Sequence, residues 1–377
     1  MSQVAATHMS SGQSRIGWVD HAKGFCIIFV VMMHSTLGVG NAAGAEGWMH
    51  YLVQFAKPFR MPDFFLISGL FLGLVIDRPW RRYFDRKVVH FFYFYVLWLS
   101  IQFVFKAPGW MAEGKTPGEL ASLFAMSFVE PFGTLWFIYM LPVFFVITRL
   151  LKRFHWAMVL GAAAVLEILP IHTGWLMVDE FAARYVYFLA GYMFANRIFD
   201  LSDWAIANHG KALLLLLAWF LGNAVMTFTP MPTSLAALSG HEGVTHLSDL
   251  PIVSLVLGAA GAIAVIVLTS LLSRIRGTDF LGYLGKNSIV VYLAFFLPMA
   301  VSRAILLKFA PFLDIGTISL LVTICGVVGP VILLAVINWT GFGGFLFKRP
   351  QWAILDRTSK DGPTRSGPAK SAFQPAE

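Results

Sequence analysis

Long apolar segments, separated by short stretches rich in arginine and lysine, recur from one end of the chain to the other. Most are close to the length of about 20 residues that an α-helix needs to cross the hydrocarbon core of a bilayer. They are too long and too uniformly apolar for the alternating pattern of a transmembrane β-barrel. We therefore predict an all-α, polytopic transmembrane bundle of about ten spans. The expected spans are 24–40, 51–76, 88–107, 131–151, 155–171, 182–199, 211–229, 251–272, 287–308 and 315–338.

The positions of the basic residues predict the orientation, because Lys and Arg in short loops remain on the cytoplasmic side of a membrane. With the N-terminus inside, the basic stretches 78–87, 149–153 and 274–286 fall on that side, and ten spans return the C-terminus to it. Composition agrees with a membrane protein, since 58% of the 377 residues are hydrophobic and 13% are charged. The net charge of +8 then reflects topology, and we expect contact with membrane lipid and none with nucleic acid.

The two ends of the chain differ in composition from the apolar middle. Residues 1–15 are rich in Ser, Gln and Ala, and the segment 350–377 is largely polar with several Gly and Pro. We predict that both are disordered cytoplasmic tails of a transmembrane domain over 16–349. Cys26 and Cys325 each lie inside a predicted span, so no disulfide framework is expected. The first span is expected to remain in the mature protein.

Lys23 and His34 bracket the first apolar stretch, in the run AKGFCIIFVVMMHS. Eleven residues are almost a whole number of helical turns, so the two side chains are predicted to share a face about 16 Å apart. An ionisable group inside a membrane is costly and indicates a functional site. A neutral imidazole can act as a general base or carry an acyl group. The alternatives are that His34 forms a packing hydrogen bond between helices and that Lys23 snorkels to the headgroups.

The second apolar stretch is the least regular, because Pro58 and Pro62 fall within QFAKPFRMPDFFLISGL. Each proline removes a backbone donor, so we predict a kink or a break in this span. Arg60 and Asp63 are three residues apart there and would share one side of a helix. We predict a pocket formed by His34, Arg60 and Asp63. The alternative is an Arg60–Asp63 ion pair that only neutralises two charges inside the membrane.

Further polar groups have two interpretations each. Arg81 and Arg82, in the basic stretch 78–87, would attract the phosphates of a nucleotide cofactor such as coenzyme A, but the positive-inside rule accounts for them as well. Glu167 and Arg184 lie toward the predicted outer side, where they would contact an acceptor or serve as ordinary interfacial groups. The histidines of the 230–250 loop have no convincing metal-ligand arrangement, and no metal is expected.

Four motifs together resemble the integral-membrane acyltransferase-3 family. They are WVDHAKG followed by VVMMHS, then FRMPDFFLISGLFL, GTLWFIYMLPVFF and LGKNSIVVYLAF, in the order and spacing of that family from about residue 16 to 340. The resemblance assigns the family's basic residue and histidine to Lys23 and His34, and its second-span arginine to Arg60. This chain departs from it in three ways: the family often has arginine at Lys23, many relatives have an apolar residue at Asp63, and many have a histidine where Phe295 stands.

The resemblance implies an enzyme of a bacterial-type cytoplasmic (inner) membrane that moves an acetyl or succinyl group from acyl-CoA to a hydroxyl of a carbohydrate or lipid-linked glycan. His34 would be the base or acyl carrier, Arg60 would polarise the reacting groups, and Asp63 would set their charge state. Lys23, Arg81 and Arg82 would hold the anionic donor. A transporter or flippase that uses the same charges is the alternative, followed by a sensor or scaffold. Oligomerisation is left open.

Overall fold

The computed structural model describes residues 16–232 and 245–355. The expected tails 1–15 and 356–377 lie outside the described residues. Within the described ranges every regular element is a helix, and the extended pairing is an isolated bridge between Pro230 and His246. The α-helices are α2 (Gly17–Ala43), α3 (Met49–Ala56), α4 (Arg60–Gly69), α5 (Trp80–Phe84), α6 (His90–Ala112), α7 (Pro117–Met126), α8 (Trp136–Leu151), α9 (Trp156–Ile168), α10 (Leu176–Met193), α11 (Ala195–Ala207), α12 (His209–Phe228), α14 (Pro251–Leu272), α15 (Asp279–Lys286), α16 (Ser288–Ala294), α17 (Phe296–Phe309) and α18 (Ile315–Thr340). Short turns of other helix types are η1 (Leu72–Leu74), η2 (Asp85–Val89), η3 (Gly133–Leu135), η4 (Leu247–Asp249), η5 (Arg276–Thr278), η6 (Gly344–Leu346) and η7 (Gln351–Ala353). The all-α prediction is confirmed.

Fewer helices than expected are long and apolar enough to cross a membrane in the described ranges. Over the described ranges, six helices are long and apolar enough to cross a membrane, or seven if the bent pair α16 and α17 forms one span. The predicted count of ten and the cytoplasmic position of both termini are therefore not confirmed. The difference lies in short or charged helices: α9 has only 13 residues, and α10 contains Asp179, Glu180 and Arg184.

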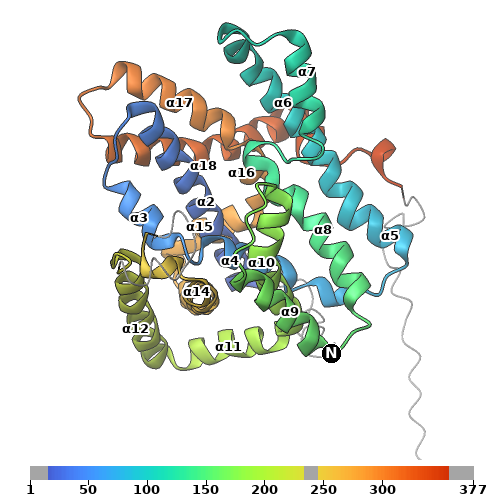
Figure 1. The fold of residues 1–377 in the computed structure, drawn as a ribbon, viewed down its shortest axis with the longest axis vertical. Coiled ribbons are helices and arrows are strands. Elements are labelled where there is room, and N and C mark those ends of the chain that lie inside the picture. The colour runs from blue at the N-terminus through green and yellow to red at the C-terminus, as the bar shows by residue number, and fades with distance from the viewer. Residues whose placement is uncertain (1–15, 233–244, 356–377) are drawn as a thin grey trace, which may run out of the picture.

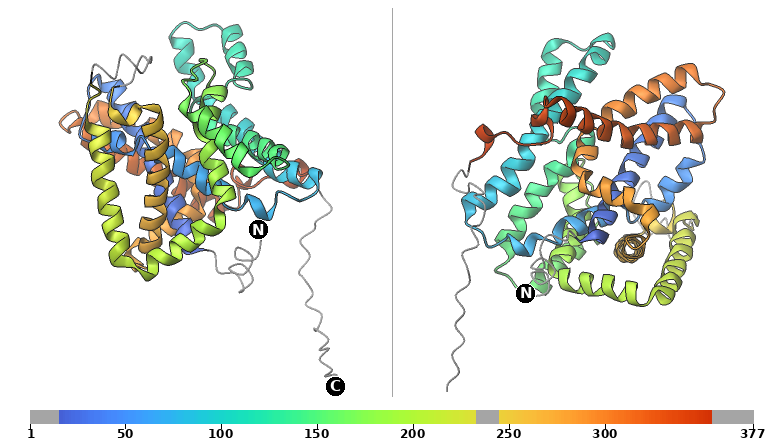
Figure 2. Two further views of the ribbon diagram at one scale, coloured as in Figure 1. Left: turned by 60° about the horizontal axis from the view of Figure 1, so that its bottom comes forward. Right: turned by 180° about the vertical axis from the view of Figure 1, so that it is seen from behind.

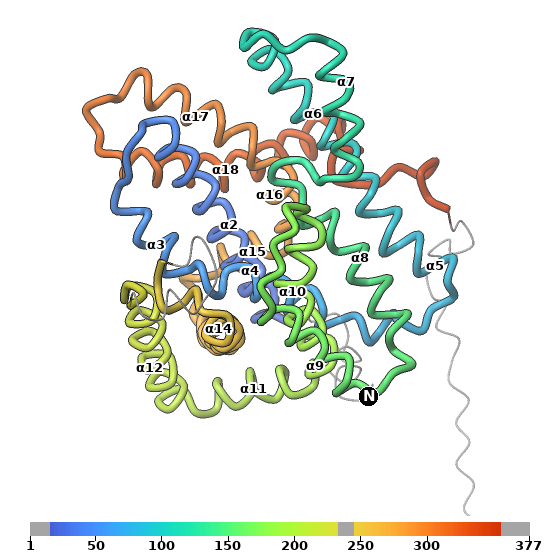
Figure 3. Tube along the Cα trace, in the orientation of Figure 1, coloured from blue at the N-terminus to red at the C-terminus, as the bar shows by residue number. Residues whose placement is uncertain are grey.

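The second predicted span is broken, as its prolines indicate. α3 ends at Ala56 and α4 begins at Arg60, with Pro58 in the turn between them. Pro62 falls in the first turn of α4, where the missing backbone N–H costs no helical hydrogen bond. Figures 1 and 3 show α3 and α4 as separate pieces beside α2. The break places Arg60 and Asp63 at the beginning of a helix inside the bundle.

α2 is the central helix, packed against α15, α18, α14 and α4 (Figure 1). Two glycines let the α2 and α15 backbones touch. A Cβ at Gly24 would lie 2.0 Å from the Leu281 carbonyl oxygen, and one at Gly285 would lie 1.7 Å from the Asp20 carbonyl oxygen. Since no side chain fits between the two backbones, the face of α2 that carries Asp20 and Gly24 is held at a fixed distance from α15.

The chain after α18 folds back along α6, as the views in Figure 2 show. Trp98 of α6 donates to the Leu346 carbonyl, and Arg349 forms an ion pair with Asp85 at 2.7 Å. The Leu355 backbone N–H donates to the same carboxylate at 2.9 Å. Residues 350–355, where we expected the tail to begin, are thus attached to the bundle through η2.

Candidate active site

His34 lies inside the bundle against a bend in another helix. Its half-buried ring has its centroid 5.4 Å from that of Phe295, with 33° between the ring planes. Phe295 is fully buried and stands at the 52° bend between α16 and α17. Phe295, where the resemblance led us to expect a histidine, is therefore in ring contact with His34. Sequence analysis had singled out this position only as a departure from the resemblance.

Arg60 and Asp63 project from the first turn of α4. The two side chains form no ion pair with each other in the described structure, which disfavours mutual neutralisation. Arg60 Nε and Nη1 and Asp63 Oδ1 are buried atoms without a hydrogen-bond partner. Buried polar atoms are nearly always hydrogen-bonded, so these three atoms indicate a place where a ligand would supply partners.

His34 and the pair Arg60 and Asp63 come from α2 and α4, two helices that pack against each other. The Arg60 charge acts on His34, which places these two residues in one electrostatic neighbourhood. Asp63 instead acts on Cys26 of α2 and Tyr187 of α10.

Lys23 lines a cavity of about 140 Å³, which we call the Lys23 cavity. Its walls come from α2, α4, α6, α8 and α16, and include Phe64, Ser68, Phe137 and Tyr292. The Tyr292 ring lies 5.5 Å from Phe137 and 6.3 Å from Phe295 between centroids. A row of aromatic rings therefore connects the Lys23 cavity to the ring that contacts His34.

Arg81 and Arg82 lie on α5 and do not line the Lys23 cavity. Arg81 donates to the Leu355 carbonyl at 3.2 Å, and Arg82 has a buried Nε without a partner. Arg149 of α8, which sequence analysis counted only toward topology, stacks on Trp80 at 4.0 Å and also has a buried, unpartnered nitrogen. The cations that could hold the donor thus occur in two places: Lys23 inside the bundle, and a cluster of arginine side chains around α5.

Within the described ranges, no three His, Cys, Asp or Glu side chains are placed to hold a metal ion. His241 and Glu242 of the loop considered earlier lie outside those ranges.

The chain is similar to a protein family and to curated membrane and nodulation proteins. The model of a protein family described as an acyltransferase domain matches residues 16–339. The inner membrane protein YcfT of Escherichia coli (strain K12) is 25% identical over 207 residues, which cover 48% of this chain and 57% of that protein. The nodulation protein NolL of Sinorhizobium fredii (strain NBRC 101917 / NGR234) is 26% identical over 206 residues, which cover 53% of this chain and 54% of that protein. The chain spans about half the length of the curated relatives it matches, and no solved structure matches it.

Proposed function

Because this chain belongs to the acyltransferase family whose domain covers residues 16–339, we propose that it is a membrane O-acyltransferase. It takes an acetyl or succinyl group from acyl-CoA on the cytoplasmic side and transfers it to a hydroxyl of a carbohydrate or glycolipid. The position of the enzyme is the cytoplasmic (inner) membrane, which the six or seven apolar helices of the described part and the name of the relative YcfT support.

The observation that carries this proposal is the placement of His34. Its ring lies inside the bundle, under the influence of the Arg60 charge, and contacts Phe295 at the end of the aromatic row that begins at the Lys23 cavity. A histidine kept only for packing would not need within electrostatic range a guanidinium with two buried, unpartnered nitrogens, because a buried charge without partners is destabilising.

The size of the Lys23 cavity favours a short acyl group. A cavity of about 150 Å³ holds a molecule the size of benzene, so 140 Å³ accommodates an acetyl or succinyl group but not a fatty acyl chain. The nucleotide of coenzyme A does not fit in this space and must lie outside it. Arg81, Arg82 and Arg149 supply cations for its phosphates at the α5 end.

The residues present divide the reaction into two roles. His34 accepts the proton of the acceptor hydroxyl while that oxygen attacks the thioester carbonyl, and Arg60 stabilises the negative charge that develops on the carbonyl oxygen. The carbon–sulfur bond then breaks, and the coenzyme A thiolate leaves with the proton that His34 held. If His34 instead attacks the thioester itself, the carbon–sulfur bond breaks first and the ring carries the acyl group. The acceptor oxygen then displaces the imidazole, and the hydroxyl proton passes to the coenzyme A thiolate.

The test is transfer of radiolabel from acetyl-CoA to glycan or lipid in membranes that contain the full chain. His34→Ala should lower transfer at least about 100-fold, the usual contribution of a positioned general base. His90→Ala is the matched control, because His90 is likewise a half-buried histidine on an apolar helix in contact with phenylalanine rings. Full activity of His34→Ala would refute the assignment. Binding of substrate without any transfer of label would favour a transporter.

A further inference from the structure

A second cavity, of about 390 Å³, lies at the other end of α4 from the Lys23 cavity. It is bounded by Lys57 and Pro58 from the α3–α4 turn, by Glu167 at the end of α9, by Arg184 of α10 and by Asp249 of η4. We call it the Glu167 cavity. Its volume falls in the range of small-molecule sites, about 300–1,000 Å³.

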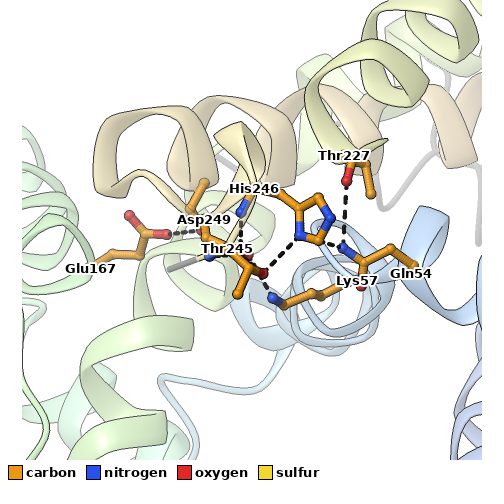
Figure 4. Close-up of polar contacts among 8 residues, drawn as sticks. Gln54, Lys57, Glu167, Thr227, Thr245, His246 and Asp249 are labelled. Atoms are coloured by element: carbon orange, nitrogen blue, oxygen red, sulfur yellow. Dashed lines mark hydrogen bonds and ion pairs between the residues drawn. The ribbon is translucent and has the colours of Figure 1, made fainter. Parts of the chain in front are cut away.

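Most charges in this cavity are already paired within the protein. Lys57 Nζ lies 2.6 Å from Asp249 Oδ1, and Arg184 Nε lies 3.0 Å from Glu180 Oε2. Figure 4 shows the Lys57–Asp249 contact and, beside the segment that carries Asp249, the carboxylate of Glu167. The charges of each pair offset each other, so the remaining acidic groups of the lining are Glu167 and Asp179.

The Glu167 carboxylate has one satisfied and one unsatisfied oxygen. Oε1 accepts from the Ser254 hydroxyl at 3.1 Å and from the Tyr187 hydroxyl at 3.4 Å. Oε2 is buried and has no hydrogen-bond partner, and the same holds for the Ser248 hydroxyl in the same wall. Leaving a buried polar oxygen without a hydrogen bond is costly, so this atom is suited to form one with a ligand.

The lining excludes anionic ligands and favours neutral polyhydroxyl compounds. Its carboxylates are Glu167, Asp179, Glu180 and Asp249, against the permanent cations Lys57 and Arg184. A phosphate or carboxylate ligand would therefore meet a net negative field, which argues against the acyl-CoA donor here. A sugar ring fits the lining better, because its hydroxyls donate to carboxylates and its C–H faces pack on apolar walls such as Pro58 and Pro251.

The Glu167 cavity is coupled to the candidate catalytic residues. Pro58 in its wall is two residues from Arg60, and the charges of Arg184 and Glu180 act on Arg60. Tyr187, which donates to Glu167, is within electrostatic range of Asp63. Since Phe64 and Ser68 of the same helix line the Lys23 cavity, Arg60 and Asp63 stand on α4 between the two cavities.

We propose that the Glu167 cavity binds a neutral sugar ring of the acceptor, with a ring hydroxyl donating to Glu167 Oε2. This inference rests on the proposed acyl transfer, since it assigns the acceptor of that reaction to the end of α4 opposite the donor. Lys57 and Arg184, held by their carboxylate partners, keep the walls in place around the ring.

The experiment uses purified full-length protein in lipid nanodiscs, with the methyl glycosides of glucose, galactose, mannose and N-acetylglucosamine as neutral probes and methyl glucuronide as the anionic probe. Transfer from acetyl-CoA is followed by mass spectrometry. In Glu167→Gln the glycoside concentration for half-maximal transfer should rise about tenfold, because a hydrogen bond between the glycoside and the Glu167 carboxyl group is lost. The acetyl-CoA concentration for half-maximal transfer should change less than twofold. Glu113→Gln, an exposed carboxylate at the end of α6, is the matched control.

A second measurement does not depend on activity. At saturating concentration at least one neutral glycoside should raise the thermal unfolding temperature of the wild-type protein and not that of Glu167→Gln, while methyl glucuronide should have no effect. Equal stabilisation of the two proteins, stabilisation by the glucuronide, or no stabilisation by any neutral glycoside would overturn the sugar assignment. Stabilisation by a neutral glycoside without any consumption of acetyl-CoA would refute the acyl transfer and leave the sugar site standing.

Discussion

The ion pair between Asp85 and Arg349 should be the most costly single polar contact to break at the C-terminal attachment. The Asp85 side chain is 0% exposed and that of Arg349 is 6% exposed. Asp85 Oδ2 accepts from Arg349 Nη2 at 2.7 Å, Oδ1 accepts from the Leu355 N–H at 2.9 Å, and the Asp85 backbone carbonyl accepts from Arg349 Nη1 at 2.9 Å. Asp85→Asn keeps the size of the side chain and removes its charge.

The magnitude follows from the burial of the partner that stays behind. Asp85→Asn leaves the Arg349 guanidinium buried and uncompensated, a change that costs about 3–5 kcal/mol when one partner of a buried pair is lost. The exposed pair of Lys152 with Asp77, whose side chains are 43% and 72% exposed, provides the matched control. Asp77→Asn should cost less than about 1 kcal/mol, because solvent screens an exposed pair.

The assay is unfolding in mixed micelles of dodecyl sulfate and a non-ionic detergent, with helix content followed by circular dichroism. The double variant Asp85→Asn with Arg349→Met should be less destabilised than the sum of its single variants, with a coupling of about 0.5–3 kcal/mol. The argument fails if Asp85→Asn is no more destabilising than Asp77→Asn, or if the two single effects simply add.

Two further predictions concern the site and its surroundings. Phe295→Ala should destabilise the protein by about 3–5 kcal/mol and lower acyl transfer, because it leaves a cavity beside His34. Phe295→His introduces the residue found there in many of the proteins that this chain resembles, and it should restore transfer more fully than unfolding stability. Equal recovery of transfer and stability would contradict the idea that this ring supports His34. Burial alone would raise the pKa of Asp249, but hydrogen bonds from Lys57, Thr245 and His246 outweigh it and hold the pKa below its ordinary value of 3.8. The stability this carboxylate contributes is therefore present above about pH 4 and is lost as the pH falls below that value, so a pH series of thermal unfolding should show a loss in the wild-type protein that is smaller in Asp249→Asn.

Sequence patterns identified the helices better than they identified the spans. Each of the ten expected segments contains helix, because apolar runs of this length specify helical backbone. They did not reveal that the segment 182–199 divides, with α10 ending at Met193 and α11 beginning at Ala195, since Phe194 carries no helix-breaking signal. The two prolines of the second span did carry such a signal, and there the break was predicted.

Contacts between distant segments were beyond the reach of the sequence. Nothing local marks Asp85 as the partner of Arg349, 264 residues away, and the basic stretch around it had a sufficient explanation in topology. Glu167 and Arg184 had two interpretations for the same reason. Helical spacing predicts which side chains share a face, as for Lys23 and His34, but not which cavity that face borders, because the cavity depends on how four or five helices pack.

The charges around α4 make the strongest physical case for a ligand between the two cavities. Arg60 and Arg184 carry like charges within electrostatic range of each other, and only Arg184 has a carboxylate partner, Glu180. A purely structural arrangement would pair Arg60 or replace it with an apolar side chain, since an unpaired buried guanidinium opposes folding. A residue that breaks this local rule without a compensating contact in the described structure is expected at a functional site. The developing negative charge of an acyl-transfer transition state would supply the missing partner. The repulsion between Arg60 and Arg184 raises the free energy of the empty site. Binding the transition state relieves that repulsion, which favours the transition state over the empty site.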